Sequence, residues 1–197
     1  MSPSNYPPAF IAGRLALDFA NTAPNSRELS WSDFVLFLAD AGVITRERAA
    51  RLSSLADTEP QAVDAVSLKM LRLRESVRAV FSARAEKRPI GKNWVEPIND
   101  ILRITEGHDE LSQHDRTWHL QFIARENGLE WLLAAIARSA AELLVEGPDA
   151  PVRRCANAHC RLFFYDNSRT RRRRWCSMTT CGNRHKVSAF LKRRKRQ

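Results

Sequence analysis

The chain has 197 residues, 44% of them hydrophobic, which suffices for one core of ordinary size, and no apolar run reaches the roughly 18 residues of a membrane-spanning helix. The net charge of +10 is concentrated near the end of the chain, because residues 153–197 hold 15 Lys and Arg against one acid, whereas residues 1–152 hold 17 against 21. Composition and charge thus argue against a membrane protein and favour a polyanionic partner for the basic tail.

The start of the chain carries no mark of export. Residues 1–14 lack the basic start and the long apolar run of a secretory signal. We therefore expect a cytoplasmic protein, and in that compartment thiols remain reduced.

Two short helices are expected after residue 30. Ser30 or Ser32 can cap the first of them, and Gly42 can end it. The second begins near Thr45 and covers residues 45–56.

The clearest helical signal lies between Pro60 and about Lys87. Apolar residues recur there in steps of three and four, namely Val63, Val66, Met70, Leu73, Val77 and Val80. This spacing places them on one face of a long helix. Pro89 and Gly91 then break the chain.

The segment from residue 101 to residue 151 is expected to hold a hairpin, a helix and a linker. Turn residues separate two runs rich in apolar and aromatic side chains, so we expect a β-hairpin that pairs 101–106 with 116–123. Residues 129–145 are apolar nearly all round, which predicts a central helix covered on most sides. The turn-rich residues 146–151 form a natural linker.

The four cysteines follow the pattern C-x4-C-x15-C-x4-C near the end of the chain. They are Cys155, Cys160, Cys176 and Cys181. Four thiolates can surround one zinc ion tetrahedrally at about 2.3 Å, and such a closed shell leaves no open position for a substrate. The pattern therefore predicts one structural zinc ion. Two disulfides or four free thiols are the alternatives, and His159 or His185 could replace a cysteine ligand.

A module this small and this charged is expected to need the metal in order to fold. Its expected apolar filling is Phe163, Phe164, Trp175, Val187, Phe190 and Leu191, with the last three turned inward from a helix at about 183–194. The expected fold is mainly α (α+β). A multihelical domain with a small β-hairpin, residues 1–150, precedes a small four-cysteine zinc-binding module that ends in a helix, residues 151–197.

Residues 155–187, CANAHCRLFFYDNSRTRRRRWCSMTTCGNRHKV, resemble a CGNR zinc finger, which is named for the tetrapeptide at Cys181–Arg184. The match includes both cysteine pairs, the Phe-x-Asp-x-Ser stretch from Phe164 and the run Arg-Trp-Cys-Ser-Met. Residues 13–22, GRLALDFANT, resemble the opening of the ABATE domain that usually precedes this finger. The resemblance implies a bacterial, stress-induced transcription regulator with a zinc-dependent DNA-binding tail.

Basic side chains of the module are the expected contacts to nucleic acid, because arginine forks match phosphate oxygens and a helix can enter the major groove. The candidates are Arg169, Arg171, Arg172, Arg173, Arg174, Arg184, Lys186, Lys192 and Arg193. Asn183 could read adenine or bond backbone in a turn. Asp166 is expected to cap a turn or to pair with an arginine.

Other functions remain open at this stage. An RNA-binding or ribosome-associated accessory factor would use the same charge, with exposed aromatic rings to stack on bases. An enzyme with a pocket in residues 1–150 is disfavoured, since no nucleophile elbow, phosphate-binding glycine loop or open metal triad stands there. Asp18 and Asn21 could line a pocket for a small effector or could simply bond neighbouring backbone. A homodimer through the apolar face at 63–80 is equally open.

Overall fold

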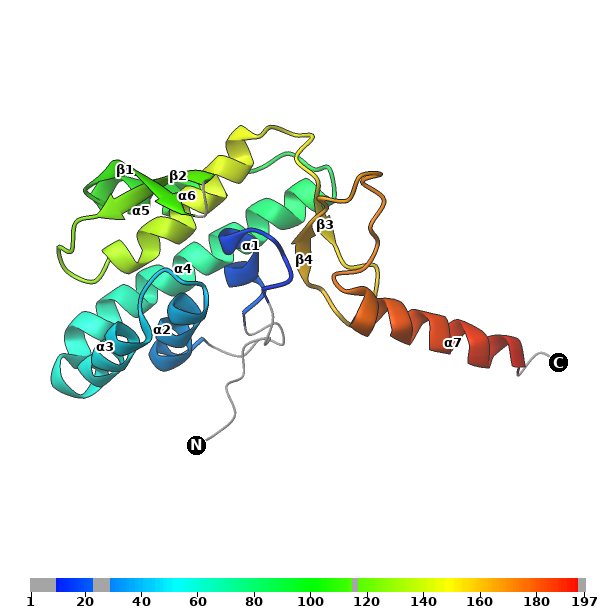
Figure 1. Ribbon diagram of the computed structural model, residues 1–197, viewed down its shortest axis with the longest axis horizontal. Coiled ribbons are helices and arrows are strands. Elements are labelled where there is room, and N and C mark those ends of the chain that lie inside the picture. The colour runs from blue at the N-terminus through cyan, green and yellow to red at the C-terminus, as the bar shows by residue number, and fades with distance from the viewer. Residues whose placement is uncertain (1–9, 23–28, 115–116, 195–197) are drawn as a thin grey trace.

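The computed structural model describes residues 10–22, 29–114 and 117–194. The helices of this part are α1 (Leu15–Ala20), α2 (Trp31–Asp40), α3 (Arg46–Thr58), α4 (Pro60–Ala85), α5 (Lys92–Ile104), α6 (Trp131–Val145), the π-helix η1 (Met178–Gly182) and α7 (Asn183–Arg194). The strands are β1 (Gly107–His114), β2 (Thr117–Ala124), β3 (Val152–Arg154) and β4 (Phe163–Tyr165). They form two separate two-stranded antiparallel sheets among the helices (Figure 1), which confirms the predicted fold class.

The caps of α2 and α3 are the ones that the sequence predicts. The Ser30 hydroxyl accepts a hydrogen bond from the Asp33 backbone N–H at 3.1 Å. The Thr45 hydroxyl accepts one from the Arg48 N–H at 3.2 Å. Each cap satisfies a backbone donor that the first helical turn leaves free. Gly42 follows α2 with a φ of +72°, a left-handed conformation in which glycine ends helices without strain.

Helix α4 is the central element of the part of the chain before residue 151, which we call the body. Its apolar stripe is buried as predicted, and Pro60 stands in its first turn, where a missing N–H costs nothing. Helices α1, α3, α5 and α6 all contact it. Helix α6 is buried over most of its surface, with Leu132, Leu133, Ile136, Ala140 and Leu143 in the core, so that prediction is confirmed as well.

The hairpin differs from its prediction. Residues 101–104 end helix α5, and the first strand is the more polar segment Gly107–His114, paired with Thr117–Ala124 so that Leu111 stands opposite Leu120. Ile101 is buried because it completes the apolar face of a helix. Leu111 and Leu120 are exposed at 64% and 68%, so the hairpin does not bury the alternating pattern that normally reveals a strand.

The second sheet is attached to the body. Val152 of β3 and Phe163 of β4 belong to the same buried cluster as α4 and α6. On β4, the Tyr165 N–H donates to the Ala12 carbonyl at 2.8 Å. The Asn21 side chain donates to the Phe163 carbonyl and accepts from the Phe163 N–H, both at 2.8 Å. The division at residues 150 and 151 stays a prediction, and extensive contacts cross it.

Helix α7 extends away from the rest of the molecule (Figure 1). Within the described ranges, no helix is long and apolar enough to cross a membrane.

Candidate zinc site and basic surface

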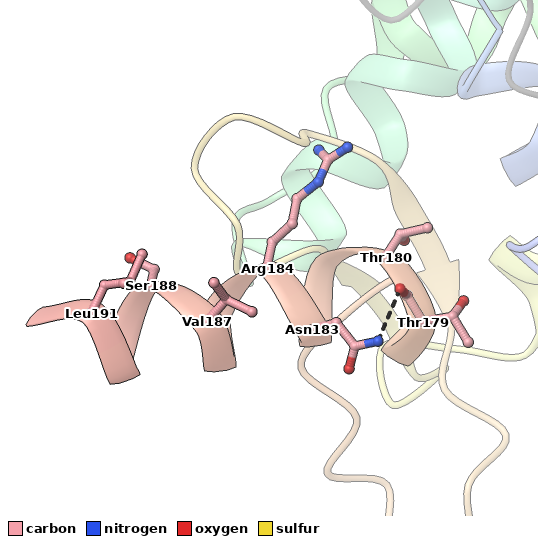
Figure 2. A pocket seen from close by; sticks show the side chains of 7 residues that line it. All are labelled: Thr179, Thr180, Asn183, Arg184, Val187, Ser188 and Leu191. Atoms are coloured by element: carbon pink, nitrogen blue, oxygen red, sulfur yellow. Dashed lines mark hydrogen bonds between the residues drawn. The ribbon is translucent and has the colours of Figure 1, made fainter.

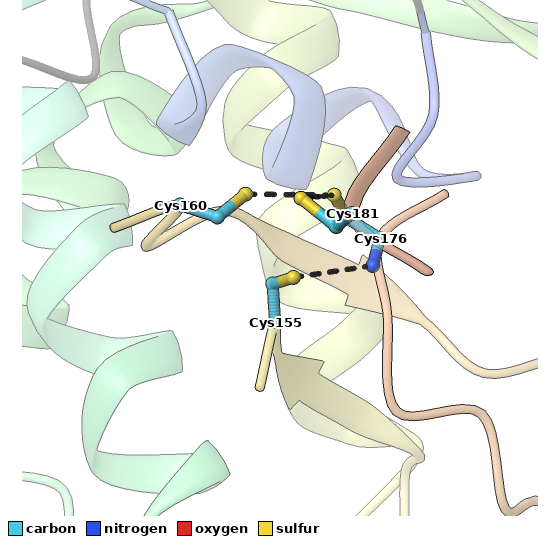
Figure 3. Close-up of side chains that lie close together, drawn as sticks. All are labelled: Cys155, Cys160, Cys176 and Cys181. Atoms are coloured by element: carbon cyan, nitrogen blue, oxygen red, sulfur yellow. Dashed lines mark hydrogen bonds between the residues drawn. The ribbon is translucent and has the colours of Figure 1, made fainter. Parts of the chain in front are cut away.

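The four cysteines come from two short turns and one helix start. Cys155 directly follows β3, and its N–H donates to the Leu162 carbonyl at 2.8 Å. Cys160 ends a tight turn in which its N–H donates to the Asn157 carbonyl at 2.9 Å. Cys176 precedes η1 and Cys181 lies within it. The equal spacing within each pair therefore brings all four side chains to one point (Figure 3).

The geometry of the four sulfurs fits one zinc ion. All four lie within 4.8 Å of one another. The Sγ atoms of Cys160 and Cys176 are 3.5 Å apart, and those of Cys176 and Cys181 are 3.8 Å apart. A tetrahedron with Zn–S bonds of about 2.3 Å requires about 3.8 Å between sulfurs. All four cysteines are free thiols, so the disulfide alternative does not apply to this structure.

The surroundings of the sulfurs favour the thiolate at Cys181 and disfavour it at Cys160 and Cys176. Burial raises the pKa of the Cys160 thiol to about 11, and burial with neighbouring thiols raises the pKa of the Cys176 thiol further. Burial alone would raise the pKa of Cys181, but the hydrogen bond from the Asn157 amide at 3.4 Å and those from neighbouring thiols outweigh it and lower that pKa. A divalent cation supplies the charge that deprotonates all four thiols.

Asp166, the lone acid of the module, is fully buried beside the metal site. Its carboxylate accepts from the Ser168 N–H at 3.2 Å and from the Arg173 N–H at 2.9 Å, and it pairs with the Arg153 guanidinium at 3.1 Å. Burial would raise the pKa of Asp166, but a hydrogen bond from the Ser168 hydroxyl, the two backbone bonds and the Arg153 charge lower it. Asp166 was expected to cap a turn or to pair with an arginine, and it does both.

Arg173 differs from the other arginines of its run. Its Nε donates to the Trp175 carbonyl at 2.9 Å, and its Nη2 donates to the carbonyl of Cys176, a metal-site residue. Its guanidinium also lies 4.6 Å from the centre of the Phe164 ring, a cation–π contact. Arg173 therefore holds the loop against the cysteine cluster.

Residues 169–174, which we call the arginine loop, present the other arginines of the run on the surface. Its exposed members are Arg169, Arg171, Arg172 and Arg174. The Arg171 carbonyl accepts from the Arg153 guanidinium. The Arg174 carbonyl accepts from the Ala156 N–H at 2.9 Å. Hydrogen bonds thus tie the backbone of the loop to the residues around Cys155, while its charged side chains reach solvent.

The prediction that helix α7 turns its apolar residues inward is wrong. Val187, Phe190 and Leu191 are exposed at 57%, 52% and 51%. Helix α7 packs against η1 and otherwise projects outward, so the buried filling of the cysteine cluster comes from Phe164, with Trp175 packed partly against it. Phe163 belongs to the core of the body instead.

The exposed side of α7 forms a shallow groove of about 650 Å³ (Figure 2). Its lining residues are Thr179, Thr180, Asn183, Arg184, Val187, Ser188 and Leu191. The Asn183 amide donates to the Thr179 carbonyl at 3.2 Å, the backbone contact expected of a turn residue. Arg184, Lys186 and Arg193 are exposed on the same helix, while the side chain of Lys192 lies outside the described residues.

Both histidines beside the cysteines are exposed, and neither belongs to the group of four ligands. The His185 ring packs on the Trp175 ring with 4.7 Å between centroids. Sequence reasoning missed Asn157 and Arg153, which bond a ligand sulfur and the buried Asp166. The position of Asn157 inside the first Cys-x4-Cys turn could have indicated its role. No sequence signal indicates the role of Arg153, because its partner Asp166 lies 13 residues further along the chain.

Asp18 and Asn21 both form hydrogen bonds to backbone, one of the two roles that the sequence left open for them. Asp18 Oδ1 accepts from the Ala12 N–H at 3.0 Å. Burial raises the pKa of Asp18 to about 6, although hydrogen bonds from the Ala12 and Ile11 backbone partly offset the effect. Asn21 bonds Phe163, as described above. The two residues therefore link the start of the chain to the body and to β4.

Comparison with known families agrees with this architecture. Residues 13–147 match the ABATE family, described as "Putative stress-induced transcription regulator", and residues 152–194 match the CGNR zinc finger. No curated protein matches the chain significantly. The first match covers well over half of the chain, and the second contains the four clustered cysteines. The chain belongs to the ABATE family and carries a CGNR zinc finger whose four cysteines can hold one zinc ion.

Proposed function

We propose that this protein is a zinc-dependent transcription regulator that binds duplex DNA through its finger. The observation that carries the proposal is the exposed side of α7, which presents polar and apolar side chains clear of the body, next to the arginine loop. Its family membership supports the regulatory role.

The arginine loop and helix α7 would bind different parts of the duplex. Arg169, Arg171, Arg172 and Arg174 would contact phosphates and set the register of the protein on the duplex. Helix α7 would enter the major groove, where Asn183 and Arg184 can donate to base edges and Val187 can contact a thymine methyl group. The zinc ion would be structural, since it fixes the loop relative to the helix and four thiolates leave it no open position.

The burial of the aromatic side chains favours duplex DNA over RNA. Phe163 and Phe164 are buried, and Trp175 is half-buried with its ring packed on the His185 ring. Recognition of single-stranded RNA depends on exposed rings that stack on bases. In the described part of the finger, Phe190 is the one phenylalanine that stands exposed.

The remaining features of the proposal concern the body. We propose that residues 1–150 act as the regulatory unit and residues 151–197 as the binding unit, in the cytoplasm and without catalysis. A small effector sensed near Asp18 and Asn21, and a homodimer that reads a palindromic site, would complete such a regulator.

The test is selection of the zinc-loaded protein against random duplex DNA at physiological salt, with excess nonspecific competitor. We expect an enriched motif, and a palindromic motif would indicate a dimer. Two matched variants separate the roles. Asn183→Ala should relax specificity at one position of the motif, whereas Arg172→Ala should weaken binding to all sequences alike.

Two outcomes of this selection would contradict the proposal. No enrichment, together with binding that vanishes as salt rises, would reduce the finger to an electrostatic anchor. Enrichment of a defined RNA under the same conditions would assign the protein to the RNA-binding class instead.

A further inference from the structure

A pocket of about 530 Å³ lies in the body, where helices α4 and α6 both end on the side that faces the finger (Figure 1). Its wall comes from the end of α4 with the residues that follow it, and from the end of α6 with residues 147–149. We call it the helix-end pocket. It shares no lining residue with the groove on α7, and its volume lies in the range of small-molecule sites.

Arg84 fixes the shape of this pocket. Its Nη1 donates to the Leu143 carbonyl at 2.8 Å and to the Gly147 carbonyl. Its Nη2 donates to the Leu144 carbonyl at 3.4 Å. The end of a helix leaves such carbonyls without partners in the helix, and here a side chain of α4 supplies them. The two helix ends are therefore held together by the protein itself, and the pocket needs no ligand to form.

Lys87 occupies a backbone position that favours glycine. Its φ is +54°, and its N–H donates to the Arg84 carbonyl at 3.0 Å. The Arg88 N–H donates to the Ala83 carbonyl at 2.8 Å, which completes a common pattern for ending a helix. After α6 the corresponding residue is Gly147, with a φ of +87°. A lysine in this conformation costs stability that glycine would not, and such a cost is typical of residues kept for binding.

The lining of the pocket carries a net positive charge. It contains Arg84, Lys87 and Arg88 against one acid, Asp149. Glu86 lies outside the lining, accepts from Arg88 Nε at 2.8 Å and offsets that charge, so one positive charge remains. Within the described ranges, the exposed Lys87 ammonium forms no ion pair with Asp149 or with any other acid. A ligand with a single negative charge would balance the pocket.

The rest of the lining is apolar. Ile90 and Leu144 are half-buried and pack against the core of the body. Pro89 and Pro148 complete this part of the wall. Apolar walls with a few polar groups are typical of sites that bind small organic molecules, because the walls remove the hydrocarbon part of the ligand from water.

We propose that the helix-end pocket binds a small carboxylic acid, as its monoanion, with a hydrocarbon part of a few carbons. Lys87 pairs with the carboxylate, and Ile90 and Leu144 contact the hydrocarbon part. A dianion such as phosphate fits less well, because it exceeds the charge of the pocket and meets the like charge of Asp149.

The pocket lies beside the connection between the body and the finger. Residues 147–149 in its wall lead towards β3. Glu86 bonds Arg88 of the pocket at 2.8 Å and Arg154 at the end of β3 at 3.2 Å. A ligand here would contact the segment that holds the finger, which is a position from which an effector can act on it.

The experiment titrates sodium hexanoate into the zinc-loaded, 15N-labelled full chain without DNA, at constant ionic strength. The backbone amide of Gly147 is followed by NMR, and that of Gly182 in η1 serves as the distant reference. We expect a saturable shift of Gly147 alone, with a Kd of about 1 mM or tighter. Acetate should bind more weakly, since each buried CH2 group raises affinity by up to about 4-fold. 1-Hexanol and inorganic phosphate should each bind at least 5-fold more weakly than hexanoate.

Two variants test the charges of the pocket. Lys87→Gly removes the ammonium group and retains the backbone conformation, so Kd for hexanoate should rise at least 5-fold while Tm does not fall. Its matched control is Arg161→Gly, which removes one charge at a φ of +52° outside the pocket and should bind hexanoate as the parent does. Asp149→Asn removes the like charge and should tighten binding about 2-fold or more.

Four results would overturn the inference. The first is the absence of a saturable Gly147 shift with hexanoate, and the second is equal binding of 1-hexanol, which would be general apolar contact. The third is an unchanged Kd in Lys87→Gly. The fourth is tighter binding of phosphate than of hexanoate, which would contradict the assigned class of ligand. Failure of the DNA selection would leave all of these measurements unaffected, because the pocket is separate from the proposed DNA surface.

Discussion

At the scale of single residues, the buried Asp18 and the half-buried Arg173 show how polar side chains hold the two parts of this chain. Asp18 fixes the backbone of Ala12, whose carbonyl accepts from Tyr165 on β4. Arg173 fixes the carbonyl of Cys176 beside the metal site. Neither role depends on solvent contact, and each makes a distinct prediction.

The raised pKa of Asp18 predicts how stability changes with pH. The carboxyl group binds its proton more tightly in the folded chain, with a pKa of about 6 against an ordinary 3.8. Its contribution to stability is therefore complete below about pH 4 and is lost as pH rises through 6. Asp18→Asn should remove this loss and raise the free energy of unfolding at pH 7.5 by up to about 3 kcal/mol.

Urea unfolding at pH 4.5 and pH 7.5 measures the effect. Asp64→Asn, at an exposed position of α4, is the control and should leave the difference between the two pH values unchanged. If Asp18→Asn and the parent lost the same stability between these pH values, another group would be responsible.

The contacts of Arg173 predict a role in holding zinc. Arg173→Ala should lower the affinity for zinc about 10-fold, as the loss of a group next to the ligands commonly does. Competition with a coloured chelator measures this affinity. Arg172→Ala, the neighbouring exposed arginine, should retain zinc fully. Equal zinc affinity in both variants would contradict the structural role of Arg173.

At the scale of elements, the arginine loop is expected to act through charge. Replacement of Arg169, Arg172 and Arg174 by Ala should reduce the slope of log affinity for DNA against log salt by roughly 3, because each phosphate contact contributes about 0.9. Binding measured between 50 and 300 mM salt gives the slope.

A control with the same change in net charge replaces Arg51, Arg72 and Arg103, which are exposed on helices of the body. That variant should keep the original slope. A matching fall in both variants would mean that total charge, and not the loop, governs binding.

Local signals account for the elements that the sequence predicted well. Ser30 and Thr45 mark helix starts because capping depends on residues three positions away, and the stripe on α4 is visible because its period is local. Helix α7 has the same kind of apolar stripe, yet Val187 and Leu191 are exposed. Periodicity identifies a helix but does not say whether a partner covers it, and β1 was missed because its face is not covered.

At the scale of the whole molecule, the cysteine pattern predicted the metal site because four ligands at fixed spacing have few other arrangements. The attachment of the finger to the body could not be predicted. It depends on the bonds of Asn21 to Phe163, which join residues 142 positions apart. No local pattern encodes a contact of that range.

Loss of zinc should therefore affect both parts of the chain, though unequally. Cys176→Ser, or chelation of zinc from the parent, should abolish DNA binding and release the arginine loop, while most helical ellipticity remains. Because Val152 and Phe163 lie in the core of the body, the Tm of the body should fall by a few degrees. Circular dichroism at 222 nm during heating measures both effects. Unchanged binding and unchanged Tm together would contradict a structural zinc.

The pairing of Asn21 with β4 also has a consequence for synthesis on the ribosome. At about 5–20 residues per second, roughly 7–30 s pass between the emergence of Asn21 and that of Phe163. During this interval helix α1 lacks the core contacts that β4 later supplies to one of its sides. The nascent body is therefore open on that side until the finger has been translated, and the start of the chain reaches its final place among the last segments to do so.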